Sequence, residues 1–377
     1  MDIIQEAENI EEEVVLFRRE LHLYPELAGH EVMTTEYIRE RLEEWGISYR
    51  LVEPAGVIGV IGSGSYTTAL RADMDGLEVE EETELSFRSQ NSGCMHACGH
   101  DGHMAILLAA AKILKEHENK LDHRIMLVFQ PAEEIAQGAA DILETGILNQ
   151  ADRIFGLHIF SGIEKGKISL EPGPRMASTN WFSIRIGGKS GHAGKPQECV
   201  DAAVVAASLA MNLQTIISRS INPLESAVLT IGRMEAGTAR NVIAGDAVLE
   251  GTVRTFSGAV QEQIRRRMEE IVEAAGQMYH ADISLDFQPA SHPALRNDER
   301  VVRDVMRQAA EVFSEDDFVH VPPMMLGEDF ANYLMEIRGC FAFIGGGGRY
   351  PNHHSMFDFD EDILVQGVKL MLVFASV

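Results

Sequence analysis

The sequence predicts an α/β fold: a mostly parallel sheet flanked by helices, interrupted by an inserted ferredoxin-like (βαββαβ) domain. Three observations predict it. Helical patterns alternate with short apolar runs in the first half of the chain, as in parallel sheets covered on both faces. The middle of the chain changes to the order strand, helix, strand, strand, helix, strand. The first pattern then returns, so we expect one domain from residues 1–179 and 291–377 and a second from 180–290.

The first predicted elements are two helices and two strands. Apolar residues recur at helical spacing in residues 4–24 and again in 32–45. The apolar runs 56–61 and 67–72 follow as strands, and the second run continues into Asp73-Met74-Asp75-Gly76. Acids at the carboxyl end of a strand lie where α/β sheets hold their active sites, so this segment is a candidate site.

A stretch rich in cysteine and histidine comes next, Cys94-Met95-His96-Ala97-Cys98-Gly99-His100-Asp101-Gly102-His103. It leads directly into the apolar run 104–111, which predicts a buried helix. Thiols and imidazoles together at a helix entry favour soft and borderline metals, so we interpret the stretch as a source of metal ligands. From these residues alone, a redox or core cysteine pair with incidental histidines remains the alternative.

Two further strands deliver polar side chains at their carboxyl ends. Residues 124–129 run into Gln130-Pro131-Ala132-Glu133-Glu134, and the strand 154–157 ends on His158. Because the carboxyl ends of parallel strands meet at one edge of a sheet, we expect these side chains to converge. One of two adjacent glutamates can bind metal while the other faces substrate. Alternatively, both are acids favoured in the first turn of a helix after Pro131.

The rest of the chain completes the inserted domain and then the first one. The predicted elements are strand 181–186, helix 200–219, strands 227–234 and 247–256, helix 259–279, strand 281–288, helix 298–313, strand 340–344 and a last helix after residue 360. The loop after strand 340–344 carries His353 and His354. A doubled histidine in a loop is either solvated surface or a supplier of a further metal ligand.

Composition limits the partners. Against 32 Lys and Arg there are 58 Asp and Glu, and the formal charge of −26 disfavours nucleic acids and anionic membranes. We see no apolar stretch of the roughly 18 residues that a membrane span needs, and the first residues are acidic where a secretory signal would be basic. The four cysteines are too scattered for a disulfide framework. We therefore expect a cytoplasmic protein.

Taken together, the motifs resemble those of the metal-dependent aminoacylase/hippurate hydrolase family, which includes the plant auxin-conjugate amidohydrolases. The resemblance is carried by Met95 to His103, Phe129 to Glu134, Gly156-Leu157-His158 and His354-Ser355, and it extends over nearly the whole chain. It implies a two-metal amidohydrolase that cleaves N-acyl amino acids, of N-acetyl or N-benzoyl type, to a carboxylate and a free amino acid. The alternative is a metallo-dipeptidase or carboxypeptidase of the same fold.

The resemblance also implies roles for single residues in the first domain. Two divalent ions per subunit, Mn²⁺ or Zn²⁺ with Co²⁺ or Ni²⁺ as alternatives, would be held by Cys98, His100, Glu134, His158 and His354. Glu133 matches the general base. Asp75 matches an acid that orients the base or binds metal, and Asp73 is a weaker candidate for that role.

The inserted domain resembles the family's lid and dimerisation domain, which implies a homodimer or a larger assembly. His192 matches a histidine that assists the oxyanion across the dimer interface, and its alternative is an ordinary loop histidine. Asn241, Arg254 and Glu328 match positions tied to substrate binding, although Arg254 could equally pair with surface acids. Gln197 stands where the family has a second histidine, which leaves the acyl group undetermined.

Overall fold

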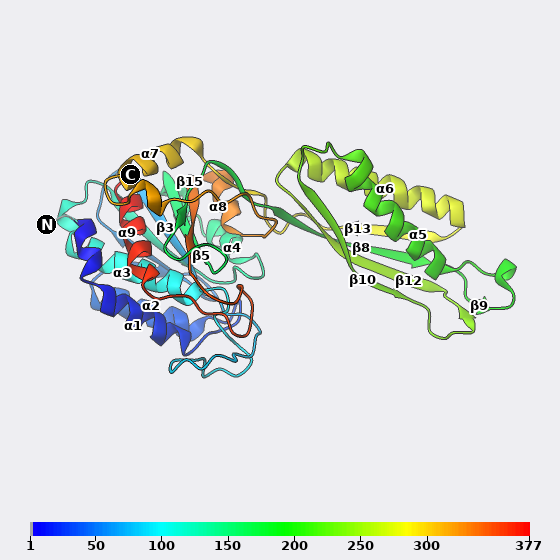
Figure 1. Cartoon of the computed structure of the whole chain (residues 1–377), viewed down its shortest axis with the longest axis horizontal. Coiled ribbons are helices and arrows are strands. Elements are labelled where there is room, and N and C mark those ends of the chain that lie inside the picture. The colour runs from blue at the N-terminus through cyan, green and yellow to red at the C-terminus, as the bar shows by residue number, and fades with distance from the viewer. Residues whose placement is uncertain (1–2) are drawn as a thin grey trace. The chain divides into compact units, whose positions relative to one another are not determined.

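The computed structural model describes residues 3–377, which form two compact units (Figure 1). The first unit comprises the chain up to Arg175 together with Arg296–Pro322 and Asp329–Val377. The second comprises Met176–Leu295 and the short segment Pro323–Glu328. The first boundary lies four residues before the expected one, and the second lies five residues after it. The chain also enters and leaves the second unit once more at Pro323–Glu328.

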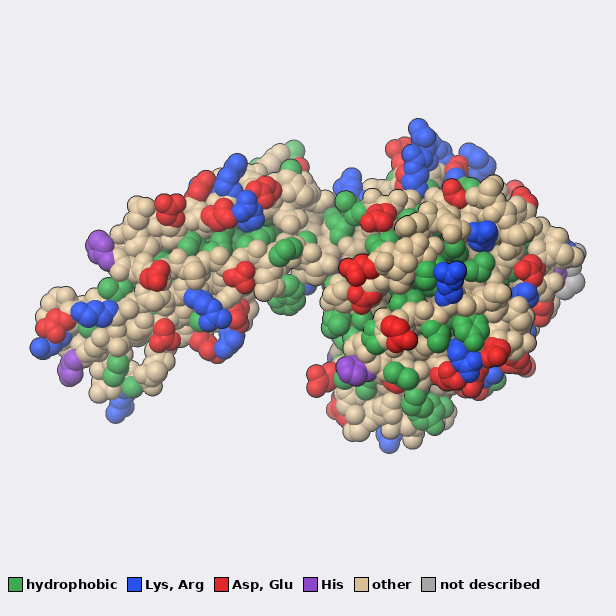
Figure 2. Space-filling view, turned by 180° about the vertical axis from the view of Figure 1, so that it is seen from behind, with side chains coloured by type: hydrophobic (Ala, Val, Ile, Leu, Met, Phe, Trp, Pro, Cys, Tyr) green, Lys and Arg blue, Asp and Glu red, His purple; other side chains and the backbone are tan. Residues whose placement is uncertain are grey.

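Charged side chains cover both units without separating by sign. On the face drawn in Figure 2, acidic and basic side chains are interspersed. Several opposite charges three residues apart in sequence form ion pairs. Arg265 lies 2.6 Å from Glu262, and Lys115 lies 2.6 Å from Glu118. Exposed pairs of this kind contribute at most about 1 kcal/mol each. The net negative charge thus bears on solubility and partners more than on the fold.

A seven-stranded sheet in the order β1-β2-β4-β3-β5-β15-β6 forms the centre of the first unit. Its four central strands are parallel neighbours, and three strands at its two sides run antiparallel to their partners. The bounds are β1 Ser48–Leu51, β2 Val57–Ile61, β3 Thr67–Asp73, β4 Arg124–Gln130, β5 Arg153–Phe160, β6 Ile168–Ser169 and β15 Arg338–Gly345. The predicted mostly parallel sheet is confirmed. Although β2 and β3 are consecutive, β4 lies between them.

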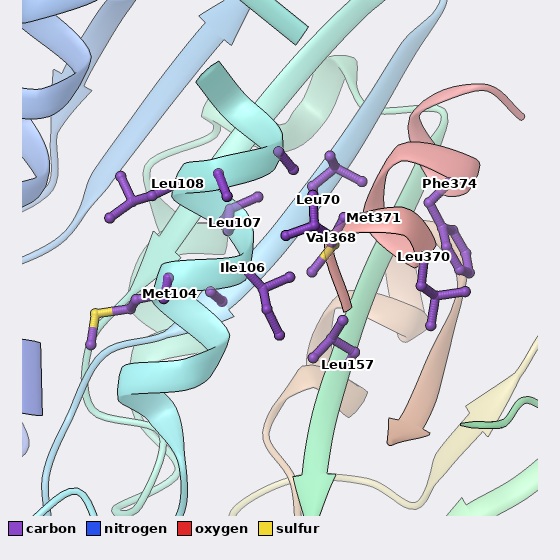
Figure 3. Packing of buried hydrophobic residues seen from close by; sticks show 14 of the residues in the cluster. Leu70, Met104, Ile106, Leu107, Leu108, Leu157, Val368, Leu370, Met371 and Phe374 are labelled. Atoms are coloured by element: carbon purple, nitrogen blue, oxygen red, sulfur yellow. The ribbon is translucent and has the colours of Figure 1, made fainter. Parts of the chain in front are cut away.

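The helix α3 (His100–Glu116) is the buried helix predicted after the cysteine and histidine stretch. It packs against α1 (Glu11–His22) and α9 (Ile363–Ala375), and Figure 3 shows its apolar side chains beside Leu70 of β3 and Leu157 of β5. Burial of each such leucine stabilises the fold by roughly 1.5–3 kcal/mol. Because the whole helix is held in this way, the residues at its N-terminal end have fixed positions.

The other helices of the first unit are short or lie at its surface. The expected helix over residues 4–24 is divided into a 3-10 turn and α1, because the chain turns between them at Asn9 and Ile10. The bounds are η1 Ile3–Glu8, α2 Val32–Glu44, η2 Glu118–Lys120, α4 Gly138–Glu144, η3 Ile147–Gln150, α7 Glu299–Ala309, η6 Glu315–Asp317 and α8 Phe330–Glu336. The strands β7 (Gly173–Met176) and β14 (Leu295–Asn297) pair where the chain leaves and re-enters this unit.

The second unit is an antiparallel sheet in the order β10-β12-β8-β13 with two helices. In chain order its strands are neighbours as 2-3-1-4, which is the ferredoxin-like arrangement that the sequence predicts. Its core joins the sheet to both helices, with Ile184, Leu209 and Ile264 buried. The bounds are β8 Ser178–Gly187, β9 Gly191–His192, η4 Pro196–Glu198, α5 Ala202–Thr215, η5 Ile216–Ser220, β10 Ala227–Ala236, β11 Val242–Ile243, β12 Asp246–Thr255, α6 Gly258–Tyr279 and β13 Asp282–Phe287.

One helical stretch, Ala202–Ser220, is long and apolar enough to cross a membrane, judged by length and composition alone. The expectation that no stretch reaches this length is therefore wrong for these residues. Part of the apolar surface serves the second core, where Val205, Leu209 and Leu213 are buried. A helix that contributes to the core of a compact unit meets the same criterion, so this feature by itself is weak support for a membrane span.

Candidate metal centre

The carboxyl ends of three neighbouring strands carry the candidate site. The strand β3 ends on Asp73 and leads to Asp75, β4 leads to Glu133 and Glu134, and β5 carries His158 near its end. Since β3 pairs in parallel with both β4 and β5, these ends lie at one edge of the sheet. Cys98 and His100 lie at the same edge. His100 is the first residue of α3, and its Nδ1 atom lies 3.2 Å from Oδ1 of Asp75.

Cys98, His100 and His158 form the buried part of this cluster. The Sγ atom of Cys98 lies 3.3 Å from Nε2 of His158, and one ligand atom from each of the three residues lies within 4.8 Å of the others. Gly99 separates Cys98 from His100 and has φ +86°, a left-handed conformation that glycine adopts without strain. This turn lets a thiol and an imidazole two residues apart approach the same point.

Glu134 and His353 complete the cluster on its more open side. The Nε2 atom of His353 lies 3.2 Å from Sγ of Cys98 and 3.4 Å from Oε1 of Glu134. The same Oε1 atom is 3.9 Å from Nε2 of His100. Cys98 therefore lies near every other member of a set of one sulfur, one carboxylate and three imidazoles.

The structure places His353 beside Cys98 and Glu134, whereas the sequence favoured His354 as the fifth residue. Both side chains are exposed, but the ring of His354 stacks on Tyr350 at 4.7 Å between centroids, and its Nδ1 atom accepts the main-chain N–H of Met356. His353 instead has φ +69°, and its main-chain N–H donates to the carbonyl of Ala97 at 2.7 Å. This backbone conformation directs the ring of His353 toward Cys98, and the ring of its neighbour away.

Hydrogen bonds set the tautomers of the two buried imidazoles. Nδ1 of His100 lies 2.9 Å from the main-chain oxygen of Asp75, and Nδ1 of His158 lies 2.9 Å from that of Ile159. A carbonyl oxygen can only accept, so Nδ1 carries the proton in both rings. In the neutral form of each ring, Nε2 then keeps a lone pair, and the Nε2 atoms are the ones that face the cluster.

The donor set fits divalent cations. Nε2 of His100 and Oε1 of Glu134 are buried atoms without a hydrogen-bond partner among the described residues, and such atoms are costly unless another group satisfies them. Burial, followed by the charge of Glu134, raises the pKa of the Cys98 thiol well above its usual value. Burial also raises the pKa of Glu134 to about 7. A cation would reverse both effects, and mixed S, N and O ligation suits borderline ions such as Zn²⁺.

Asp75 holds two members of the cluster in place. Its carboxylate accepts the main-chain N–H of Glu134 at 2.9 Å through Oδ2, and Oδ1 lies 3.2 Å from Nδ1 of His100. Burial alone would lower the pKa of His100, but Asp73 and then Asp75 raise it to about 10. In this geometry Asp75 orients a histidine and a glutamate of the cluster.

Asp73, the weaker candidate for the orienting acid, pairs with His103, to which the sequence assigned no separate role. Oδ1 of Asp73 lies 2.6 Å from Nδ1 of His103, and Nε2 of His103 accepts the main-chain N–H of Ile159. Both nitrogens of His103 are thus engaged in holding α3 to the ends of β3 and β5. Its position three residues after His100 on one helix was the available signal that the two rings share a face.

Glu133 lies beside the cluster in a constrained turn. Ligand atoms of Glu133, Glu134 and His100 lie within 4.8 Å of one another, and Oε1 of Glu133 accepts the main-chain N–H of Asp329 at 3.3 Å. The turn contains Ala132 at φ +54° and Ala136 at φ +55°. Non-glycine residues in this region store strain, which is characteristic of functional sites.

The remaining predicted residues lie in the second unit. His192 is exposed in β9, and Asn241 accepts the main-chain N–H of Ala193 through its carbonyl. The Arg254 guanidinium is part-buried and donates to the main-chain oxygen of Met325 at 2.9 Å, so it does not pair with a surface acid there. Glu328 is buried at the end of the segment Pro323–Glu328. The roles of these four residues stay predictions.

Comparison with protein families identifies one family for most of the chain. The family described as Peptidase family M20/M25/M40 matches residues 69–376. The match includes both sides of the inserted domain and every residue of the cluster.

Individual relatives are similar over nearly their full lengths. The chain is 40% identical to an N-acetyl-L-cysteine deacetylase of Bacillus subtilis (95% of this chain, 86% of the relative) and 37% identical to IAA-amino acid hydrolase ILR1-like 4 of Arabidopsis thaliana (95% and 83%). It is also 35% identical to thermostable carboxypeptidase 1 of Saccharolobus solfataricus (97% and 96%). Among solved structures, the YXEP protein of Bacillus subtilis, described as a dinuclear metal-binding peptidase of family M20, matches with a TM-score of 0.87 and 35% identity over 98% of both chains.

Proposed function

The chain belongs to the M20/M25/M40 peptidase family and is a metal-binding hydrolase, and from this premise we propose that it cleaves the amide bond of N-acyl amino acids. The products would be a carboxylate and a free amino acid. The observation that carries the proposal is the position of Glu133, whose carboxylate lies beside a sulfur, nitrogen and oxygen cluster with two unsatisfied ligand atoms. The similarity to a deacetylase and to an amino acid conjugate hydrolase supports an acylated amino acid as substrate.

We propose that Cys98, His100, Glu134, His158 and His353 hold two divalent cations, Mn²⁺ or Zn²⁺ with Co²⁺ or Ni²⁺ as alternatives. When bound, such cations lower the pKa of a coordinated water and polarise a substrate carbonyl. The ring nitrogens that face the cluster are already in the tautomer that ligation requires.

Glu133 is proposed as the general base. Its carboxylate takes a proton from the attacking water and returns it to the departing amine. Asp75 keeps Glu134 and His100 oriented, because its carboxylate accepts the main-chain N–H of Glu134 and its main-chain oxygen accepts from the ring of His100. The main-chain N–H of Asp329 limits the motion of the Glu133 carboxylate.

Further parts of the proposal concern the role of the second unit and the location of the protein in the cell. We propose a homodimer in which His192 of one protomer assists the oxyanion formed in its partner, with Asn241, Arg254 and Glu328 binding substrate. A guanidinium such as that of Arg254 can hold a carboxylate with two parallel hydrogen bonds. The cytoplasmic location expected from composition also stays a prediction.

The second candidate function is a dipeptidase or carboxypeptidase, which the similarity to a thermostable carboxypeptidase favours. It would use the same cluster on a substrate with a free amine. Steady-state kinetics on matched N-acetyl, N-benzoyl and unblocked dipeptide substrates separates the two. Higher kcat/KM for the acylated substrates supports the proposal, and a preference for the unblocked dipeptides would replace it with the second candidate.

A variant tests the base directly. Glu133→Gln keeps the shape of the side chain but cannot take a proton, so turnover should fall by about 10²- to 10⁴-fold while metal content is unchanged. The control is Glu144→Gln, an exposed glutamate at the end of α4. Chelation followed by add-back of single ions identifies the supporting metal. Full activity in Glu133→Gln, or in protein proved to be metal-free, would refute the mechanism.

A further inference from the structure

The guanidinium of Arg71 in β3 is buried between two carboxylates. Its Nη1 atom donates to Oδ2 of Asp73 at 2.7 Å and its Nη2 atom to Oδ1 of Asp329 at 3.0 Å. Its Nε atom donates to the side-chain oxygen of Gln130 at 2.9 Å. Arg71, both carboxylates and Gln130 are all almost fully buried. Removing one member of such a group would leave an uncompensated charge away from water.

Asp329 joins this network to both ends of the turn that carries the two glutamates. Before the turn, Nε2 of Gln130 lies 2.8 Å and 2.9 Å from its two carboxylate oxygens. After the turn, the main-chain N–H of Ala139 donates to Oδ2 at 2.9 Å. The main-chain N–H of Asp329 itself donates to Oε1 of Glu133. One residue thus contacts the turn at its start, its end and its proposed base.

The turn needs such support because its own backbone is strained. Ala132 and Ala136 have positive φ, and the chain closes so tightly that a Cβ atom at Gly138 would lie 1.6 Å from the main-chain oxygen of Pro131. Conformations of this kind persist only where the surroundings hold them. The buried carboxylate of Asp329 supplies such support, because it accepts hydrogen bonds from Gln130 at the end of β4 and from Ala139 in α4.

We infer that Asp329 is a positioning residue that clamps the 131–138 turn and thereby sets the position of the Glu133 carboxylate. The inference rests on the proposed function, in which Glu133 is the base. Both oxygens of Asp329 accept hydrogen bonds from Arg71, Gln130 or Ala139, so Asp329 acts through Glu133 and does not touch the reacting atoms. Arg71 extends the clamp to Asp73, which contacts His103.

The test compares Asp329→Asn with a matched variant. The amide keeps the size of the side chain but replaces one acceptor oxygen by a donor. Arg71 and Ala139 donate to different oxygens, so one of the two loses its acceptor. Because displacement of a catalytic group by about 1 Å can cost 10²-fold in rate, kcat should fall by about 10- to 100-fold. KM and bound metal should stay at wild-type values, since the proposed ligands are untouched. Asp298→Asn makes the same change at the N-cap of α7, where the amide oxygen can still accept the two main-chain N–H groups, and should leave kcat unchanged.

A second readout does not depend on activity. Hydrogen exchange measured on metal-free protein should be faster in residues 131–139 of Asp329→Asn than in wild type, and unchanged there in Asp298→Asn. Gln130→Met, which removes the donors before the turn and keeps its volume, should accelerate exchange in the same segment and lower kcat less. If Asp329→Asn does not fold, Gln130→Met takes its place in the test.

The outcomes separate the inference from the proposed function. Unchanged kcat and exchange in Asp329→Asn, or equal losses in Asp298→Asn, would overturn the clamp. A loss of metal together with activity would also overturn it, because Asp329 would then act on the ligands. If wild-type protein does not cleave N-acyl amino acids while exchange still responds as expected, the clamp stands and the proposed function fails.

Discussion

His353 has φ +69°, in the left-handed region that few residues other than glycine adopt, although histidine is found there more often than most residues. The preceding residue, Asn352, donates to the main-chain oxygens of Cys98 and Ile159 at 3.3 Å and 3.0 Å. These bonds tie the loop to the ends of the segments that carry Cys98 and His158. The next residue, His353, presents its imidazole to Cys98.

Separate replacement of the two adjacent histidines tests this assignment. His353→Ala should lower the metal content of the purified protein and activity together, because it removes an imidazole 3.2 Å from the Cys98 sulfur. His354→Ala is the matched control and should retain metal, since its ring stacks on Tyr350. Elemental analysis of both variants checks the prediction. Metal loss in His354→Ala with full occupancy in His353→Ala would reverse the assignment.

Gly138 illustrates the same constraint in the turn that carries Glu133. Adding a methyl group by Gly138→Ala would place carbon 1.6 Å from the oxygen of Pro131, so the turn must open. We expect a loss of about 1–3 kcal/mol in the free energy of unfolding and a larger loss of activity than stability alone explains. Gly162→Ala is the control, because nothing lies within 4 Å of its added Cβ atom. Denaturant titration and assays of the folded fraction check both effects.

At the scale of elements, Asp101 links α1 to the start of α3. Its Oδ2 atom lies 3.1 Å from Nε of Arg18 and 2.8 Å from Nδ1 of His22, and all three side chains are buried. The Nε2 atom of His22 contacts Glu81 at 3.3 Å in the segment between β3 and α3. The first helix thus supports the residue that follows His100, although it contributes none of the proposed metal ligands.

This link makes stability depend on pH. Burial alone would lower the pKa of His22, but Asp101 and Glu81 raise it from 6.5 to about 9 against the opposing charge of Arg18. Because this pKa is raised in the folded protein, protonated His22 contributes about 3 kcal/mol to the free energy of unfolding. The contribution is fully present below pH 6.5 and is lost as pH rises through 9. Between pH 6.5 and 9 the free energy of unfolding should fall less in His22→Gln than in wild type. A slope equal to that of wild type would contradict the prediction.

At the scale of the whole molecule, the chain builds two cores, one in each unit. All the residues of the cluster belong to the first unit, whereas His192, Asn241 and Arg254 belong to the second. The second unit therefore supplies none of the proposed metal ligands. Its proposed contribution is to substrate binding and to assembly.

Mixed dimers test that contribution. If His192 assists the partner's site, a heterodimer of His192→Ala and Glu133→Gln protomers keeps one complete site. Purified heterodimers should then recover about half of wild-type activity, although each parent homodimer is inactive. Chromatography of differently tagged chains verifies the pairing. Heterodimers as inactive as the parents would place His192 in its own protomer's site.

The sequence by itself determined the α/β class, the buried helix after the cysteine and histidine stretch, the ferredoxin-like unit, and the convergence of Cys98, Glu134 and His158. These features follow from periodicity along the chain and from the rule that parallel strands end at one edge of a sheet. The folded chain was needed to see that His353 lies beside Cys98 and His354 does not, and that Arg71 pairs with Asp329, 258 residues apart. The reason is physical. Neighbouring loop residues differ in the direction their backbone imposes, and a buried ion pair between distant segments leaves no periodic signal in either.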